Sequence, residues 1–444
     1  MKTKIVIIGG GAGGMTAAAQ LGKIKEKYEV TVIEKGDKVS WAGCPTPYYI
    51  SGELSIKSIV HFLPQYFIDM GINVKINSVA EKIDRKNKKV IIIEEGLKKE
   101  IKYDKLIVST GGKAIRPEIK GISGKEEWIF KLSNADDAIK IKKYIENNKL
   151  KKAIIVGSGF VGLEMAEAFY KNGIGVKIIE KAEKIFPWLN DAAREKVINM
   201  CKEKGIELIT GSSIKNIKTI KNQNSIILEN GNKLECDILL FSIGIKPNIE
   251  IIENSGVKME GGKLIPNCKL KIEKDIYAIG DLIHIKNIIT GEIVHAPFGD
   301  VADKQALLVV KDILGEKINY KGVQGSYATS FFEIKIAGTG INLKKAKELG
   351  IAAESLNVKV FFKNAGFLDS KSGDMEVVYD VDKKIVLGAF MIGYEAVAQF
   401  VDLISIVISK KIPIKEFMDF DYCYSPTNSV VWNPMLAIYR KLYK

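Results

Sequence analysis

The feature that most constrains this chain is a strand followed by a glycine-rich loop and a helix, which occurs twice. The first copy has the apolar strand Ile5–Ile8 and a loop at residues 9–14. The second copy has the apolar strand Ala153–Val156 and a loop at residues 157–162. A single G-x-G-x-x-G loop is a weak signal. Two copies in the same setting predict an α/β fold with two Rossmann-like dinucleotide-binding domains.

Each loop is followed by a helical pattern and then by a strand that ends at a glutamate. The helical patterns cover Met15–Lys25 and Leu163–Asn172, and the strands end at Glu34 and Glu180. A carboxylate at this place accepts hydrogen bonds from ribose hydroxyls and repels a 2′-phosphate. Glu180 therefore favours NADH over NADPH.

The glycines of the two loops have separate expected roles. The first permits a tight turn, the second lets a pyrophosphate approach the backbone, and the third lets the helix pack against the strand. The helix N-terminus adds amide donors and the positive end of the helix dipole. In order along each loop, these glycines are Gly9, Gly11 and Gly14 in the first copy and Gly157, Gly159 and Gly162 in the second.

The length and charge of the chain exclude several classes of protein. At 444 residues it is long enough for two or three domains. The net charge of +14 is spread along the sequence, and no stretch mixes dense basic residues with aromatic ones, so we expect no nucleic-acid partner. No apolar run reaches the ~18 residues that span a bilayer, and the N-terminus does not resemble a signal peptide. We therefore expect a cytoplasmic protein without a membrane anchor.

The five cysteines suit a reducing compartment better than a disulfide framework. They are odd in number, form no Cys-x-x-Cys motif, and none lies at metal-ligand spacing from a histidine. We therefore expect neither a metal site nor structural disulfides. The sequence contexts of Cys201, Cys236 and Cys268 indicate structural residues, and the three histidines are expected to be structural or on the surface.

Cys44 has a different context from the other cysteines. It lies shortly after the first loop–helix–strand unit, within Ser-Trp-Ala-Gly-Cys-Pro-Thr-Pro-Tyr-Tyr at residues 40–49. A lone cysteine beside a dinucleotide site can take electrons from a flavin and pass them to sulfur, whereas an inert buried thiol is the alternative. Pro45 favours the first position of a helix, which places Cys44 at a helix entrance. There the helix dipole is expected to stabilise the thiolate.

A third region begins near Gln324. The alternating segments Glu376–Asp380 and Val386–Ile392 predict antiparallel strands, and Glu395–Ser409 predicts an amphipathic helix. This pattern indicates an α+β domain. The tail at residues 420–444 is rich in tyrosine, proline and tryptophan, which suits packing against another subunit.

Together these motifs resemble the pyridine nucleotide–disulfide oxidoreductases, in particular the branch with a single redox-active cysteine. Besides the two loops, the resemblance rests on Ser-Thr-Gly-Gly at 109–112, Ile-Gly-Ile-Lys-Pro-Asn at 243–248 and Tyr-Ala-Ile-Gly-Asp at 277–281. The branch includes coenzyme A-disulfide reductases, persulfide reductases, NADH oxidases and NADH peroxidases. It implies an enzyme that uses FAD and NAD(P)H.

The resemblance also implies a domain plan and cofactor contacts. The expected domains are a discontinuous FAD-binding domain at 1–112 and 245–322, an NAD(P)H-binding domain at 113–244 and a C-terminal dimerisation domain at 323–444. The residues expected at FAD are Gly9, Gly11, Ala12, Gly14, Glu34, Lys35, Val79, Thr110, Gly111, Asp281 and Ala302. Those expected at NAD(P)H are Gly157, Gly159, Phe160, Gly162, Glu164, Glu180 and Gly244, with Phe160 as an aromatic gate and Glu164 near the nicotinamide.

By the same resemblance, Cys44 is the active cysteine. Its thiolate would attack a disulfide or persulfide and be regenerated by reduced flavin. Tyr424, in the segment 424–434, is expected to act beside Cys44 of the partner subunit in a homodimer. Coenzyme A, as substrate or product, is expected to be bound by Gln20, Lys23 and Ser40.

Two details favour a disulfide or persulfide reductase within this branch. Ala12 stands where oxidases and peroxidases usually carry a histidine, and Cys-Pro-Thr-Pro-Tyr-Tyr from Cys44 is closer to the Cys-x-Leu-Pro-Tyr of the reductases. Departures from the reductase pattern leave the substrate open; they are Gly43, Thr46, Asp303, Ala306, Thr427 and Asn428.

Other functions stay open from the sequence. The first alternative is an NADH oxidase or peroxidase that reduces oxygen or peroxide through a Cys44 sulfenate. The second is a flavin electron-transfer protein or redox sensor with a protein partner. A further possibility is that Cys423, next to Tyr424, is a second reacting thiol.

Overall fold

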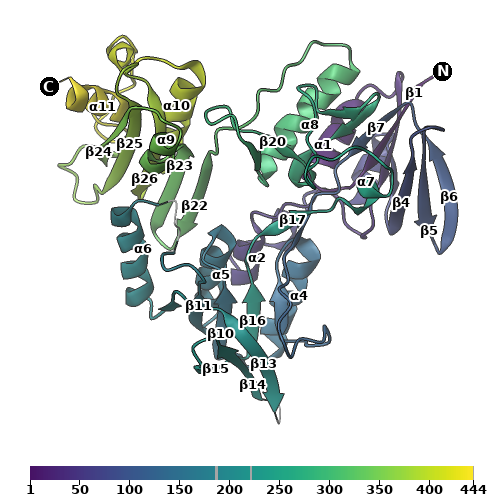
Figure 1. Cartoon of the computed structure of the whole chain (residues 1–444), viewed down its shortest axis with the longest axis horizontal. Coiled ribbons are helices and arrows are strands. Elements are labelled where there is room, and N and C mark those ends of the chain that lie inside the picture. The colour runs from purple at the N-terminus through teal and green to yellow at the C-terminus, as the bar shows by residue number, and fades with distance from the viewer. Residues whose placement is uncertain (186–188, 221–222, 444) are drawn as a thin grey trace.

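The computed structural model describes residues 1–185, 189–220 and 223–443 and contains three units, each built on its own large sheet. In Figure 1 the first unit lies at the upper right, the second at the bottom and the third at the upper left. Two units have Rossmann-like parallel sheets and the third is α+β, so the α/β fold class that we predicted is confirmed.

The first unit is built on a six-stranded sheet in the order β18-β19-β7-β1-β2-β3. All neighbours in this sheet are parallel except β18, which pairs antiparallel with β19. The bounds are β1 Thr3–Ile8, β2 Tyr28–Ile33, β3 Asn73–Lys75, β7 Lys105–Val108, β18 Lys271–Glu273 and β19 Ile276–Ala278, with helices α1 Ala12–Gly22 and α8 Gly299–Ile313. The sheet thus unites two distant parts of the chain, and the domain boundaries at 112 and 245 stay a prediction.

Shorter elements surround this sheet. An antiparallel meander consists of β4 Ser78–Asp84, β5 Lys89–Glu94 and β6 Leu97–Lys102. The short helices are α2 Thr46–Ser51, η1 Ile56–Ser58, α3 Pro64–Asp69, α7 Glu250–Glu253 and η2 Gly280–Leu282. Two small antiparallel strand pairs are β8 Gly112–Ala114 with β17 Ile245–Pro247, and β20 His284–Lys286 with β21 Ile293–His295.

The second unit has a five-stranded parallel sheet in the order β12-β11-β10-β16-β9. Its strands are β9 Ile129–Lys131, β10 Lys152–Val156, β11 Gly175–Ile179, β12 Glu207–Ile209 and β16 Ile238–Phe241. Its helices are α4 Ala135–Asn147, α5 Phe160–Lys171 and α6 Asp191–Glu203, and a small sheet adds β13 Ile214–Ile220, β14 Gln223–Leu228 and β15 Lys233–Glu235. Strands β1 and β10 are buried on both faces, which explains their continuous apolar runs.

The third unit has an antiparallel sheet in the order β22-β23-β26-β25-β24. Its strands are β22 Tyr327–Phe331, β23 Ile334–Gly340, β24 Ala353–Phe361, β25 Ser372–Asp380 and β26 Val386–Gly393. Its helices are α9 Leu343–Glu348, α10 Val397–Lys410, η3 Ile414–Met418 and α11 Pro434–Leu442. Strand β22 contacts α5 of the second unit, and Figure 1 shows it reaching down from the third unit.

The helix starts predicted after both glycine loops were too late. Helix α1 begins at Ala12 rather than Met15 and ends at Gly22, and α5 begins at Phe160 rather than Leu163. Apolar periodicity marks only where a helix packs against the core, whereas the first turn of each helix consists of loop residues. This turn is therefore invisible to the pattern, and it brings the first backbone N–H groups of the helix to the mouth of the loop.

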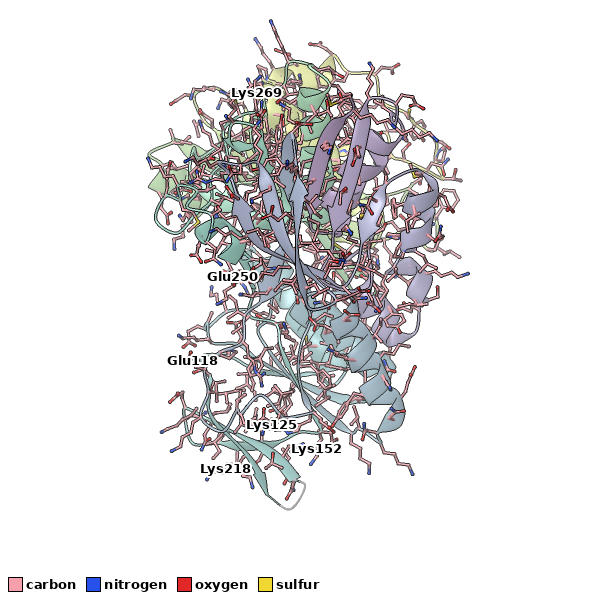
Figure 2. The ribbon with its side chains drawn as sticks, turned by 90° about the vertical axis from the view of Figure 1, so that its right-hand side faces the viewer. Glu118, Lys125, Lys152, Lys218, Glu250 and Lys269 are labelled. Atoms are coloured by element: carbon pink, nitrogen blue, oxygen red, sulfur yellow. The ribbon has the colours of Figure 1, made fainter. Side chains whose placement is uncertain are left out.

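Charged side chains are spread over the face of the molecule that Figure 2 shows. Figure 2 shows charged side chains from the bottom of the view, where Lys125, Lys152 and Lys218 lie, to the top, where Lys269 lies. The excess of +14 is therefore not gathered into one patch in this view. Among the residues that the structure describes, no helix has both the length and the apolar character to cross a membrane.

Candidate functional site

The outer glycines of the first loop are required by the protein itself. Gly9 has a φ of +107°, and a Cβ there would lie 2.1 Å from the carbonyl oxygen of Ser109. A Cβ at Gly14 would lie 2.0 Å from the carbonyl oxygen of Gly9. Only glycine fits such close approaches without a shift of the backbone. These two positions hold α1 tightly against β1 and β7.

The second loop repeats this geometry. Gly157 has a φ of +102°, and its Cβ would lie 2.6 Å from the carbonyl oxygen of Ser242. A Cβ at Gly162 would lie 2.1 Å from the carbonyl oxygen of Gly157. The two loops are therefore built alike, although they belong to different units.

The middle glycines behave differently, because nothing in the protein demands them. A Cβ at Gly11 would lie 3.8 Å from its nearest neighbour, in the ring of Trp41, and one at Gly159 would meet no atom within 4 Å. Both residues are N-caps, and as glycines neither has a side chain that could cap its helix. Open space beside the N–H groups of a helix N-terminus fits the diphosphate of a dinucleotide.

The two predicted ribose-binding glutamates hold their loops in the same way. Glu34 accepts hydrogen bonds from the N–H groups of Gly10, at 2.7 Å, and Gly36, at 2.8 Å. Glu180 accepts from the N–H groups of Ser158 and Ala182, both at 2.9 Å. Burial acts to raise the pKa of Glu180, but these hydrogen bonds outweigh it and the pKa is lowered. Glu180 is therefore a carboxylate at neutral pH.

The other residues predicted at FAD lie on several elements of the first unit. Thr110 bonds Asn248 twice, since its hydroxyl donates to the carbonyl of Asn248 and its own carbonyl accepts from the Asn248 amide, both at 2.9 Å. Asn248 had no role in the sequence-based assignment, although it ends a motif that we used for the resemblance. Of the remaining residues, Ala12 begins α1, Gly111 lies in the β7–β8 turn and Ala302 is buried in α8. Lys35, just after β2, and Val79, in β4, are exposed.

Asp281 lies in η2 and has a neighbour that sequence reasoning missed. Burial raises the pKa of the Asp281 carboxyl, and the charge of His295 opposes that rise. The His295 Nε2 atom lies 2.8 Å from the backbone oxygen of Asp281, and its ring lies 5.2 Å from that of His284. No spacing rule joins residues 281 and 295, because the β20–β21 pair brings them together.

Cys44 precedes α2 instead of beginning it. Pro45 is the N-cap and Thr46 the first helical residue, so the expected place of Pro45 inside the helix was wrong; Pro47 lies in the first turn. The expected stabilisation of the Cys44 thiolate is also wrong, because the protein's own groups together raise the pKa of the thiol. Burial raises the pKa of the Cys44 thiol.

Charged and polar groups from three other elements act on the Cys44 sulfur. The residue is solvent-exposed, yet its sulfur lies among protein groups. The charges of Glu164 and Asp281 raise the pKa of Cys44 further, whereas a hydrogen bond from the N–H of Gly299 lowers it. Gly299 is the first residue of α8, so the start of α8 aids the thiolate, and a backbone hydrogen bond of Cys44 itself also lowers the pKa.

Glu164 and Phe160 lie one turn apart on α5 and face the same region. Burial raises the pKa of Glu164 to about 7, and the hydroxyl of Thr329 donates a hydrogen bond to it at 2.7 Å. The ring of Phe160 lies 6.4 Å from Phe298, which is the N-cap of α8, and 5.2 Å from Tyr327. The structure thus brings α2, α5, α8 and β22 together around Cys44.

The predicted substrate residues lie on the first unit. The Lys23 ammonium donates to the side chain of Gln20 at 3.3 Å near the end of α1. The backbone N–H of Ser40 donates to the carbonyl of Gly10 at 2.8 Å. Tyr424, the second predicted catalytic residue, is 52% exposed on the third unit, and Cys423 is exposed as well. Gly244, predicted at NAD(P)H, is exposed with a φ of +99°.

Two departures from the reductase pattern now have a structural explanation. Asp303 accepts a hydrogen bond from the Thr16 hydroxyl at 2.7 Å, and Ala306 is fully buried in the core. A Cβ at Gly13 would lie 3.3 Å from the carbonyl of Ala302. These residues of α8 serve its close packing against α1.

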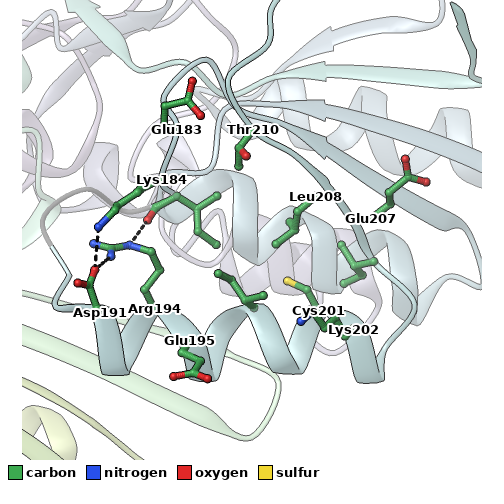
Figure 3. Close-up of a pocket in the computed structure, with 13 residues that line it drawn as sticks. Glu183, Lys184, Asp191, Arg194, Glu195, Cys201, Lys202, Glu207, Leu208 and Thr210 are labelled. Carbon is green, nitrogen blue, oxygen red and sulfur yellow. Dashed lines mark hydrogen bonds and ion pairs between the residues drawn. The ribbon is translucent and has the colours of Figure 1, made fainter. Parts of the chain in front are cut away.

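The buried cysteines contrast with Cys44. Burial raises the pKa of Cys201 and of Cys236 to about 12, so both thiols are inert at neutral pH. Figure 3 shows Cys201 at a cavity of about 610 Å³ between α6 and β12, where Arg194 bonds Asp191 and the carbonyl of Ile185. No residue from the surroundings of Cys44 lines this cavity.

Comparison with known proteins decides the family. The pyridine nucleotide-disulphide oxidoreductase family matches residues 3–297, and the dimerisation domain of that family matches residues 327–434. The chain belongs to this family. The resemblance that we inferred from its motifs is confirmed, and with it the use of FAD and NAD(P)H by an oxidoreductase.

Proteins similar to this chain are named for several different activities. An NADH oxidase of Methanocaldococcus jannaschii is 30% identical over 97% of both chains. A CoA-dependent NAD(P)H sulfur oxidoreductase of Pyrococcus furiosus is 28% identical over 99% of both chains. The structure of an NAD-dependent persulfide reductase from A. fulgidus superposes with a TM-score of 0.93 at 29% identity, over 99% of this chain and 83% of the other.

Proposed function

We propose that this member of the family reduces coenzyme A disulfide, or a persulfide or polysulfide, with electrons from NAD(P)H, FAD being the carrier and Cys44 the reacting group. The observation that carries the proposal is the position of Cys44. Groups of both cofactor-loop units act on its sulfur: Gly299 at the N-terminus of α8, in the unit with the first glycine loop, and Glu164 on the helix that follows the second loop. The similarity to a CoA-dependent sulfur oxidoreductase and to a persulfide reductase supports it.

The chemistry of Cys44 follows thiol–disulfide exchange. Its thiolate attacks one sulfur of the substrate, the substrate S–S bond breaks, and the other sulfur leaves as a thiolate that takes up a proton. Bound FAD supplies the electron pair, taken from NAD(P)H, that reduces the resulting mixed disulfide. The Gly299 N–H stabilises negative charge on the Cys44 sulfur. The Glu164 carboxyl holds a proton below about pH 7.

The proposal includes a homodimer. The match to the dimerisation domain supports it, as does the exposure of large side chains in the tail. Tyr424, Val431 and Trp432 are 52%, 59% and 52% exposed in the single chain. Side chains of this size suit the buried centre of an interface. In the proposed dimer, Tyr424 acts beside Cys44 of the partner subunit.

The second candidate function is an NADH oxidase that works through a Cys44 sulfenate. The relative from Methanocaldococcus jannaschii favours it, whereas Ala12 in the first loop offers no imidazole for oxygen chemistry. The two functions differ in the final acceptor of the electrons.

The test measures NADH oxidation with coenzyme A disulfide, coenzyme A persulfide, polysulfide or oxygen as the sole acceptor. We expect turnover with at least one sulfur compound to exceed oxygen uptake more than about tenfold. Faster oxygen uptake than sulfur reduction would replace the proposal by the oxidase. Slow turnover with all four would favour electron transfer to a protein partner.

Glu180 is expected to set the preference between the two nicotinamide cofactors. Because its pKa is lowered, its negative charge faces the adenosine ribose and opposes a 2′-phosphate. Glu180→Gln removes this charge at nearly the same size. It also loses one of the two loop hydrogen bonds, which affects both cofactors alike, so the kcat/KM ratio of NADH over NADPH reports the charge and should fall about tenfold, as expected for one charge pair near a surface. Glu235→Gln, an equal change of charge on β15, should leave the ratio unaltered. An unchanged ratio in Glu180→Gln would remove Glu180 from cofactor selection.

A further inference from the structure

Strand β22 of the third unit reaches two helices beside Cys44 with consecutive residues. The Thr329 hydroxyl donates to Glu164 on α5 at 2.7 Å, and the hydroxyls of Ser330 and Tyr48 lie 2.8 Å apart. Tyr48 belongs to α2, one turn beyond Cys44. The third unit therefore touches both the helix after Cys44 and the helix that carries Glu164.

We propose that Thr329 is a positioning residue that holds Glu164 beside Cys44 and thereby controls how easily the Cys44 thiol loses its proton. This inference rests on the proposed function only for the use of the thiolate. The contact between Thr329 and Glu164 crosses from the third unit to the second, and residues 164 and 329 share no motif.

The groups around Glu164 allow the effect to be assigned to Thr329. Burial and the charge of Glu167 raise the pKa of Glu164, and the hydrogen bond from Thr329 lowers it. The groups whose titration feels the Glu164 charge are Cys44 and Tyr48, both on or next to α2. Thr329 is uncharged and donates to the Glu164 carboxylate, so it acts on Glu164 through a hydrogen bond and not through a charge.

Glu167 is occupied elsewhere. It forms an ion pair with Lys171 at 2.6 Å and accepts the N–H of Phe332 at 2.6 Å. Lys171 also pairs with Glu53 at 2.8 Å. Asp281 also acts on Cys44, whereas the Thr329 hydroxyl donates to Glu164. The contribution of Thr329 therefore passes through Glu164.

The sign of the effect follows from these contacts. Above about pH 7 Glu164 is ionised, and its charge opposes formation of the Cys44 thiolate. Removal of the Thr329 hydroxyl raises the pKa of Glu164, so between pH 7 and 8 more Glu164 is neutral. The Cys44 thiolate then forms more readily in this window. At pH 6 Glu164 is protonated in either case, and no difference is expected.

The experiment measures the rate at which iodoacetamide alkylates Cys44 in the FAD-containing enzyme, followed by mass spectrometry of the Cys44 peptide. At pH 8 we expect Thr329→Val to react about threefold faster than the wild type, with equal rates at pH 6. Glu164→Gln should react at least as fast as Thr329→Val at pH 8. Adding Thr329→Val to Glu164→Gln should cause no further change, because both act on one carboxylate.

Two control variants separate positioning from loosening of the fold. Thr329→Ser keeps the hydroxyl and should behave as the wild type. This variant can be measured even if Thr329→Val fails to fold. Thr339→Val makes the same chemical change on β23, where the hydroxyl bonds Ser326, and should leave the pH profile unaltered. Equal acceleration at pH 6 and pH 8, an unchanged rate at pH 8, or additivity with Glu164→Gln would overturn the inference. Alkylation needs no turnover, so these outcomes are independent of the proposed substrate.

Discussion

Cys44→Ser is expected to lower the reduction of coenzyme A disulfide and persulfide by at least about 1,000-fold, the scale seen when a nucleophile is removed. A serine hydroxyl fits the space of the thiol, but it can neither form a disulfide bond nor ionise near neutral pH. The steady-state rate with each sulfur acceptor checks this result. FAD should stay bound at full occupancy, since Cys44 lies outside both glycine loops.

Cys268→Ser provides the matched control. Cys268 is also an exposed free thiol of the first unit, and its replacement should leave the rate unchanged. Cys423→Ser tests the remaining exposed thiol, which the sequence left open as a second reacting group. Full activity of Cys44→Ser on both coenzyme A disulfide and persulfide would refute the proposed mechanism.

Gly159→Val is expected to abolish NADH use while the protein keeps its fold and its FAD. The side chain enters space that no protein atom within 4 Å of the Cβ contests, so the cost falls on the ligand. The displaced diphosphate loses its hydrogen bonds from backbone N–H groups, and hydrogen bonds to a charged group contribute about 1.5–3 kcal/mol each. The KM for NADH should therefore rise about 100-fold or more. Stopped-flow reduction of the flavin by NADH and the melting temperature measure the two effects separately.

Gly11→Val is the counterpart in the first loop and should give the opposite pattern. It enters similarly open space beside Trp41, and the protein should fold but contain little FAD. If Gly159→Val were reduced by NADH as fast as the wild type, the second loop would not hold the nicotinamide cofactor. If Gly159→Val lost FAD, the two loops would have been assigned to the wrong cofactors.

Local sequence patterns were sufficient to predict the strand–loop–helix–strand unit in each parallel sheet. The apolar strands, the glycine spacings and the glutamates after β2 and β11 lie within about 30 residues of one another, so backbone geometry alone relates them. The same reasoning failed at helix starts. Pro45 was expected inside a helix that in fact begins at Thr46. The expectation failed because proline is also common just before the first turn.

The sequence by itself determined the family, the cofactors and the identity of Cys44 as the cysteine to examine. The tertiary structure alone showed which groups act on that cysteine: the Gly299 N–H, the Glu164 carboxyl and, behind it, Thr329. Each of these residues lies more than 100 positions from Cys44 in the sequence, and the three come from different units. Charge and hydrogen bonding act through space, so the ionisation of Cys44 depends on how the units pack, which no local pattern in the sequence encodes.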